Sequence, residues 1–102
     1  MDDPQQRVAT FVAAEDLDAP PAYRLLDLLS EAGELAKEAN VSTEYGSDPE
    51  AIELSTDELG DVYFSLLALA EAADVDAEAA LAGSLEKYEQ RLAADGSAGS
   101  GE

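Results

Sequence analysis

Two groups of acidic residues recur at helical spacing, so the side chains within each group would share one face of a helix. The first group, spaced by four, three and four residues, consists of Asp27, Glu31, Glu34 and Glu38. The second is the pair Glu58 and Asp61, which opens an almost wholly apolar run ending at Ala70. A carboxylate beside a buried apolar run costs on the order of several kcal/mol unless it is paired or binds a metal ion. These acids are therefore the candidate site.

A divalent cation is the partner that the composition favours for these acids. The chain has 24 Asp and Glu residues but only five Lys and Arg residues, so few cationic side chains can pair with the carboxylates. Histidine and cysteine are both absent from the sequence, which excludes imidazole and thiolate metal sites, the Ser-His-Asp triad and a cysteine nucleophile. Oxygen ligands alone favour Mg²⁺, with Mn²⁺ as a substitute, and carboxylate-bound Mg²⁺ usually keeps positions for water and substrate phosphates. The pattern indicates phosphoryl chemistry.

Two plainer interpretations of the same acids stay open at this point. In a chain this acidic, lines of carboxylates also arise as solvated helix faces. The segment Ser55-Thr-Asp-Glu58 also fits a capping box, in which Glu58 belongs to the first turn of a helix that starts there.

The elements that must position the acids are four predicted helices, and no strand signal is present. Proline caps, apolar steps of three and four residues and glycine stops place them at about 4–14, 20–40, 49–73 and 77–95. The segment 41–47 lacks an apolar period and is predicted to be a loop. The expected fold is all-α, a four-helix bundle-like protomer over residues 1–94, with a disordered Gly/Ser-rich tail at 95–102.

The third predicted helix is apolar around nearly its whole circumference, which is typical of a helix covered on all sides. Its large apolar residues are Leu59, Val62, Tyr63, Phe64, Leu66, Leu67 and Leu69. Three short neighbours cover such a helix poorly, so a homodimer, or a dimer of dimers, is expected.

The formal net charge of −19 bears on partners and surroundings. It argues against a nucleic-acid-binding surface, and it is typical of a protein from a very salty cytoplasm, where salt screens the repulsion. No stretch reaches the roughly 18 uninterrupted apolar residues of a membrane-spanning helix. We therefore expect a halophilic, cytoplasmic protein without a nucleic-acid or membrane partner.

Two motifs resemble the EExxE…ExxD signature of the MazG-like, all-α nucleoside triphosphate pyrophosphohydrolases. They are Ser30-Glu-Ala-Gly-Glu-Leu-Ala-Lys37 and Asp57-Glu-Leu-Gly-Asp-Val62, and the resemblance runs from about Arg24 to Arg91. It implies a MazG-like fold and a Mg²⁺-dependent enzyme. Such an enzyme splits a nucleoside triphosphate between its α- and β-phosphates and releases a nucleoside monophosphate and pyrophosphate.

The resemblance also implies roles for individual residues. The metal ligands and catalytic residues would be Glu31, Glu34, Glu58 and Asp61. Glu38 is a further candidate ligand. A carboxylate of the cluster would accept the proton of the attacking water, since no histidine is available. Lys87 and Arg91 resemble the family's phosphate-binding basic pair, although they also fit ordinary ion pairing on a helix surface.

One position departs from the motif, because Ser30 stands where the family has its first glutamate. The departure leaves two functions open beside a fully active hydrolase. One is a hydrolase of reduced activity, and the other is a non-catalytic helical dimer that binds divalent cations and acts as an interaction module. A purely structural acidic bundle is the third alternative.

Overall fold

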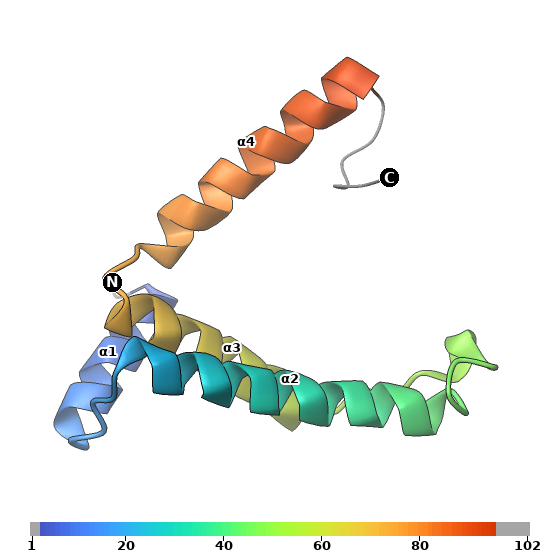
Figure 1. Cartoon of the computed structure of the whole chain (residues 1–102), viewed down its shortest axis with the longest axis horizontal. Coiled ribbons are helices and arrows are strands. Elements are labelled where there is room, and N and C mark those ends of the chain that lie inside the picture. Colours follow the sequence, from blue (N-terminus) through green and yellow to red (C-terminus); the bar gives the residue numbers. More distant parts are fainter. Residues whose placement is uncertain (1–2, 96–102) are drawn as a thin grey trace.

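This computed structural model describes residues 3–95 of the chain. They contain four α-helices and one short 3₁₀-helix, joined by loops (Figure 1). In chain order they are α1 (Pro4–Ala14), α2 (Pro21–Ser42), the 3₁₀-helix η1 (Pro49–Ala51), α3 (Thr56–Ala72) and α4 (Ala77–Asp95). No strand occurs in this range, so the predicted all-α class is confirmed. Most of the predicted Gly/Ser-rich tail, residues 96–102, lies outside the described residues.

The first and last helices begin at the caps that the sequence predicts. The carboxylate of Asp3 accepts a hydrogen bond from the backbone N–H of Gln6 at 2.7 Å and precedes Pro4, the first residue of α1. The carboxylate of Asp76 accepts from the backbone N–H of Ala79 at 3.1 Å and caps α4 in the same way. Short polar side chains therefore set both starting points.

The predicted start of the third helix at residue 49 is wrong. Pro49–Ala51 forms only a single 3₁₀ turn, and α3 begins at Thr56. The hydroxyl of Ser55 accepts from the backbone N–H of Glu58 at 3.0 Å, as in the capping-box interpretation. Between η1 and α3 the chain is extended, with φ −56° and ψ 133° at Ile52. The backbone N–H groups of Glu53 and Ser55 in this segment donate to side chains of α2, and so do not need the hydrogen bonds of a helix.

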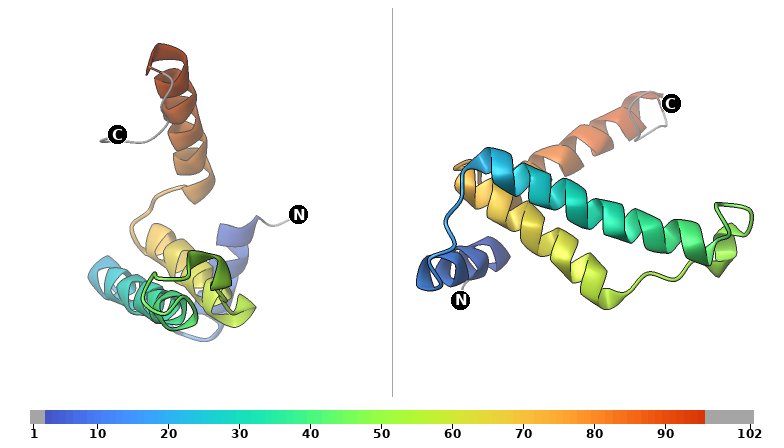
Figure 2. Two further views of the ribbon diagram at one scale, coloured as in Figure 1. Left: turned by 90° about the vertical axis from the view of Figure 1, so that its right-hand side faces the viewer. Right: turned by 60° about the horizontal axis from the view of Figure 1, so that its bottom comes forward.

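The helix α3 packs against α2 on one side and α1 on another (Figure 2). The rings of Phe11 in α1 and Phe64 in α3 meet edge to face, with their centroids 6.1 Å apart. Among the described residues only Val12, Leu67, Ala68 and Ala70 are buried apolar side chains. The core of one chain is therefore thin, and it runs along α3.

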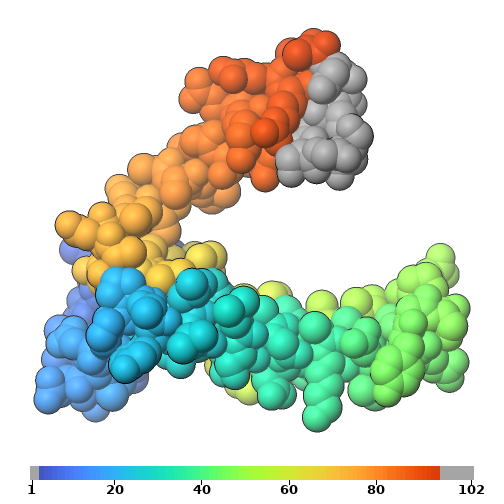
Figure 3. Space-filling model, viewed as in Figure 1, coloured from blue at the N-terminus to red at the C-terminus, as the bar shows by residue number. Residues whose placement is uncertain are grey.

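The helix α4 diverges from the other three (Figures 1 and 3). Its start is held by Gln5 of α1, whose side chain accepts from the N–H of Ala77 at 2.7 Å and donates to the carbonyl oxygen of Val75 at 2.7 Å. The α4 stripe, which we define as Leu81, Leu85, Tyr88 and Leu92, is between 39% and 58% exposed. None of the helices between residues 3 and 95 is long and apolar enough to cross a membrane.

Candidate metal centre

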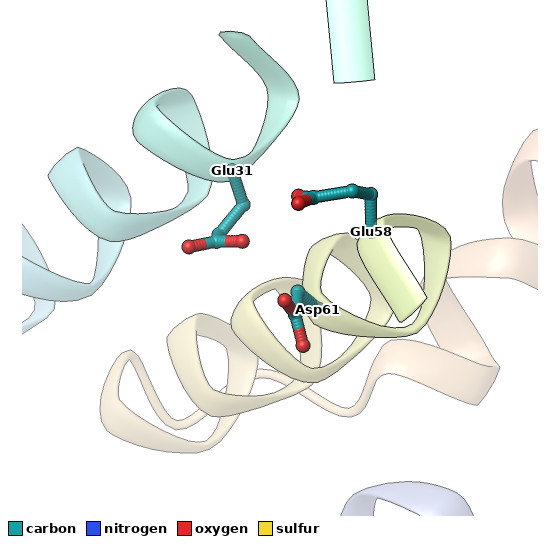
Figure 4. A group of neighbouring side chains, drawn as sticks. All are labelled: Glu31, Glu58 and Asp61. Atoms are coloured by element: carbon teal, nitrogen blue, oxygen red, sulfur yellow. The ribbon is translucent and has the colours of Figure 1, made fainter. Parts of the chain in front are cut away.

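The candidate metal centre lies where the middle of α2 faces the first two turns of α3. The cap at Ser55 fixes the first turn of α3, so that Glu58 is its third residue and Asp61 follows one turn later. Glu31 projects from α2 toward both of them (Figure 4). Two successive α-helices thus bring their acids to one place.

Three carboxylates form a close group at this point. Glu31, Glu58 and Asp61 each offer one oxygen, and these oxygens all lie within 4.8 Å of one another. The side chains of Glu31 and Glu58 are half-buried. Three oxygen donors at this separation, supplied by carboxylates alone, suit a hard divalent cation such as Mg²⁺ or Mn²⁺.

The electrostatics of the group favour a positive partner. Burial raises the pKa of Glu31 above its ordinary value, and the negative charges of Asp61 and Glu34 raise it further. Burial also raises the pKa of Glu58, with the charges of Glu38 and Glu31 as the next causes. Both carboxyl groups are therefore costly to ionise without a cation nearby.

Cationic side chains do not neutralise these three acids in the described part of the chain. The one ion pair between residues 3 and 94 joins Arg24 to Asp27, one turn before Glu31 on α2, at 3.8 Å. Arg24 also donates to the carbonyl oxygen of Leu17. The chemistry of the donor set, acidic and unpaired with Lys or Arg, fits a bound divalent ion.

Two other predicted ligands, both on α2, stand at the edge of the group. Glu34 is exposed and outside the group of three, but it is close enough for its charge to raise the pKa of both Glu31 and Glu58. Glu38 is half-buried, and its Oε1 accepts a hydrogen bond from the backbone N–H of Ser55 at 2.9 Å. Glu34 therefore remains available for a cation, whereas one oxygen of Glu38 is already used.

The predicted phosphate-binding pair is not beside the acids within one chain. Lys87 and Arg91 lie on α4, which diverges from α2 (Figure 1). The Lys87 ammonium is 4.9 Å from the centre of the Tyr88 ring, and the Arg91 guanidinium carbon is 5.9 Å from it. Both cations are therefore gathered on α4 around one aromatic ring.

A pocket beside the carboxylates is lined by Glu31, Asp61 and Ser30, the residue at which the motif departs from the family pattern. Its lining also includes Arg24 and Ser65, for which the sequence predicted no role. The Arg24 side chain is 12% exposed, and its guanidinium is held by α2 and the segment before it. The signal that could have found it is its position seven residues before Glu31, which is two turns along the same helix face.

The comparison with protein families gives one finding. A family model described as the MazG nucleotide pyrophosphohydrolase domain matches residues 21–93. The match covers α2, α3 and nearly all of α4, and so includes every predicted site residue. No curated protein and no solved structure matched the chain.

Proposed function

Because this chain belongs to the MazG nucleotide pyrophosphohydrolase family, we propose that it hydrolyses a nucleoside triphosphate with the help of Mg²⁺. The cleavage would fall between the α- and β-phosphates and give a nucleoside monophosphate and pyrophosphate. One observation carries the proposal. Glu31 of α2 meets Glu58 and Asp61 of α3 within 4.8 Å, inside the region that the family model matches.

We assign the metal ligands to Glu31, Glu34, Glu58 and Asp61. The exposure of Glu34 leaves its carboxylate free to turn toward the other three. A Mg²⁺ ion held by these residues would offset the negative charge of the phosphate oxygens and would lower the pKa of a water molecule bound to it. The elevated pKa values of Glu31 and Glu58 support the assignment, since a cation would stabilise their charged forms.

The protein's own part in the reaction is to hold the substrate and accept a proton. The oxygen of the attacking water forms a bond to the α-phosphorus. The bond from the α-phosphorus to the oxygen that bridges the α- and β-phosphates breaks, and pyrophosphate leaves. A carboxylate of the cluster accepts the water proton, because the chain has no histidine. Ser30 lines the adjacent pocket with a hydroxyl where the motif has a glutamate, so we expect slower turnover than a complete motif would give.

We further propose that the working unit contains at least two copies of the chain. In the described residues few large apolar side chains are covered, and the α4 stripe and the outer face of α3 are exposed. Tyr63 and Leu66 of α3 are 52% and 45% exposed, which is unusual for side chains of a central helix. A second copy is the simplest cover for both faces.

Such an arrangement would also give Lys87 and Arg91 a role. Within one chain α4 carries both residues away from the carboxylates. In a dimer, the α4 of one copy can approach the acids of its partner. We therefore propose that Lys87 and Arg91 bind the substrate phosphates across the interface.

The decisive experiment is a nucleotide panel. The purified protein is incubated with ribo- and deoxyribonucleoside triphosphates and Mg²⁺ in molar KCl, and pyrophosphate and orthophosphate are measured separately. The test variants are Glu34→Gln and Asp61→Asn. Asp57→Asn is the matched control, since it removes one charge from α3, one turn before Asp61, without changing any of the three grouped carboxylates.

We expect pyrophosphate from the parent and from Asp57→Asn, and none from the two test variants. Orthophosphate in place of pyrophosphate would contradict cleavage between the α- and β-phosphates. If no nucleotide is cleaved while Mg²⁺ still raises the melting temperature beyond the effect of matched ionic strength, the non-catalytic cation-binding dimer becomes the better description. A protein indifferent to Mg²⁺ would be a structural bundle.

A further inference from the structure

Two side chains on the last turns of α2 hold the extended segment that leads into α3. Glu38 Oε1 accepts from the backbone N–H of Ser55 at 2.9 Å, and Ser42 Oγ accepts from the backbone N–H of Glu53 at 2.9 Å. Residues 38 and 42 are one helical turn apart, and residues 53 and 55 lie on the same side of an extended chain. The entry to α3 is thus hydrogen-bonded to α2 at two successive points.

The first of these bonds replaces half of a capping box. In the usual arrangement the N-cap hydroxyl accepts from the third residue of the helix, whose glutamate side chain accepts from the N-cap amide in return. Here the Ser55 hydroxyl accepts from the Glu58 amide at 3.0 Å, but the Ser55 amide donates to Glu38 instead of Glu58. The Glu58 carboxylate is consequently released from capping.

The released carboxylate is the one that reaches the metal centre. The side chain of Glu58 extends from the start of α3 toward Glu31 on α2 (Figure 4). One of its oxygens lies within 4.8 Å of oxygens from Glu31 and Asp61. A Glu58 that completed the capping box would instead direct a carboxylate oxygen back to the Ser55 amide.

We propose that Glu38 is a positioning residue of the metal centre. By accepting the hydrogen bond of the Ser55 amide, Glu38 fixes the first turn of α3 and leaves the Glu58 carboxylate free for the cation. This inference rests on the proposed function in that the cation is the one proposed there. Glu38 then acts through Glu58 and does not bind the ion itself. Its carboxylate instead accepts a hydrogen bond from Ser55, the N-cap of α3, which lies 17 residues later in the chain.

The test compares two uncharged replacements of Glu38. Glu38→Gln keeps a carbonyl oxygen that can accept from the Ser55 amide, whereas Glu38→Met has a similar length and no oxygen. Both lose the same charge, so the difference between them reports the hydrogen bond. Mg²⁺ affinity is measured by calorimetry without nucleotide, and pyrophosphate release is measured separately.

We expect Glu38→Met to weaken Mg²⁺ binding by about tenfold or more, the usual cost of removing an outer-shell partner of a metal ligand. Glu38→Gln should stay within about threefold of the parent, because its acceptor is retained. Equal losses in both variants would mean that the charge or a direct metal bond matters, and would overturn the proposal. No loss in either variant would overturn it as well.

Glu53 provides the matched control. It lies in the same extended segment, and its side chain makes no hydrogen bond among the described residues, so Glu53→Gln and Glu53→Met should bind Mg²⁺ equally. A difference between them comparable to that at Glu38 would show a general effect of methionine. Such a result would count against a special role for Glu38.

A measurement on the parent protein guards against a variant that fails to fold. Hydrogen exchange of the Ser55 amide is followed by nuclear magnetic resonance with and without Mg²⁺. Protection that persists or increases with Mg²⁺ is the expected result. Protection lost on adding Mg²⁺ would mean that Glu38 leaves Ser55 for the ion, which would overturn the proposal.

The outcomes separate this inference from the proposed function. Mg²⁺ binding that depends on the Glu38 acceptor, with no nucleotide cleaved, would retain the positioning role and reject the hydrolase. Normal hydrolysis with an unaffected Glu38→Met would do the reverse. A parent protein that binds no Mg²⁺ would overturn both.

Discussion

At the scale of single residues, the fold holds Glu31, Glu58 and Asp61 together against their mutual repulsion. Burial and like charges raise the pKa of Glu31 and of Glu58, so each ionised group opposes folding when no cation is present. As the proposed cation site, this group would lower the stability of the metal-free protein in exchange for binding. Two predictions follow from the cost of these charges.

Replacing Glu31 with glutamine should separate stability from activity. Glu31→Gln removes a charge from a crowded group while keeping the side-chain shape, so the metal-free variant should melt at a higher temperature than the parent. The variant should lose more than about 100-fold in pyrophosphate release, because even outer-shell partners of ligands cost about 10- to 100-fold. Thermal unfolding in chelator and a pyrophosphate assay provide the two measurements, and a variant that melts lower without metal would contradict the argument.

The stability of the metal-free protein should depend on pH with a defined sign. The folded pKa of Glu31 and of Glu58 lies above the ordinary value of 4.5, so their contribution to stability is fully present below pH 4.5. It is lost as the pH rises through the raised folded values. Urea unfolding in chelator should therefore show a steeper decline of stability with pH in the parent than in Glu31→Gln/Glu58→Gln. Parallel curves for the two proteins would disprove the assigned cause.

At the scale of elements, caps and side-chain bonds decide where helices begin. The early start predicted for the third helix relied on a proline signal, which the structure satisfies with the single 3₁₀ turn of η1. The later signal at Ser55 prevails because α2 supplies acceptors for the amides of Glu53 and Ser55. A local pattern could not reveal those partners, which lie more than ten residues away.

The turn into α4 offers a test of such a bond. Gln5 accepts from the Ala77 amide and donates to the carbonyl oxygen of Val75 and the carboxylate of Glu71. Gln5→Ala should lower the free energy of unfolding by about 1 kcal/mol, measured by urea titration, because an amide and a carbonyl lose their partner. Gln6→Ala is the matched control: the described structure gives the Gln6 side chain no hydrogen bond, so this change should be neutral or slightly stabilising. Equal effects at both positions would refute the role of Gln5.

At the scale of the whole molecule, one chain leaves many large apolar side chains exposed, and this exposure is the basis of the proposed dimer. The α4 stripe and the outer residues of α3 remain accessible, and α4 makes an open angle with the other helices (Figure 3). A second copy that covers these faces would also bring a basic pair to each acidic group. This arrangement can be tested by mixing inactive variants.

Glu31→Gln and the double variant Lys87→Ala/Arg91→Ala should each be inactive alone. If acids and basic pair come from different copies, a mixed dimer contains one intact site. Random exchange of subunits should then restore about one quarter of the parent activity, since half of the dimers are mixed and each has one site of two. Pyrophosphate release after mixing and subunit exchange is the measurement.

Leu85→Glu in the α4 stripe serves as the control for this recovery. A charge at a residue that is 52% exposed in one chain but covered in a dimer should favour the monomer. Introduced into both inactive variants, it should abolish the recovery and reduce the molecular mass in solution to that of one chain. Recovery that survives in a monomer, or no recovery in a stable dimer, would contradict a shared site.

Much of this protein can be predicted from the order of its residues. The periodic apolar positions, prolines and short polar caps predict four helices and their approximate positions, since these are local effects of spacing and hydrogen bonding. The acid spacing indicates a cation site, because carboxylates one turn apart share a helix face. The motifs also identify the family that the match over residues 21–93 establishes.

Only the tertiary structure decides which acids meet and how each is used. Glu31, Glu58 and Asp61 converge because α2 packs on α3, a long-range contact that no spacing along the chain specifies. The same packing puts Glu38 on the Ser55 amide, and so distinguishes it from the acids one and two turns earlier on its own helix. Sequence periodicity describes one helix at a time, whereas the distances between carboxylates depend on how two helices are held together.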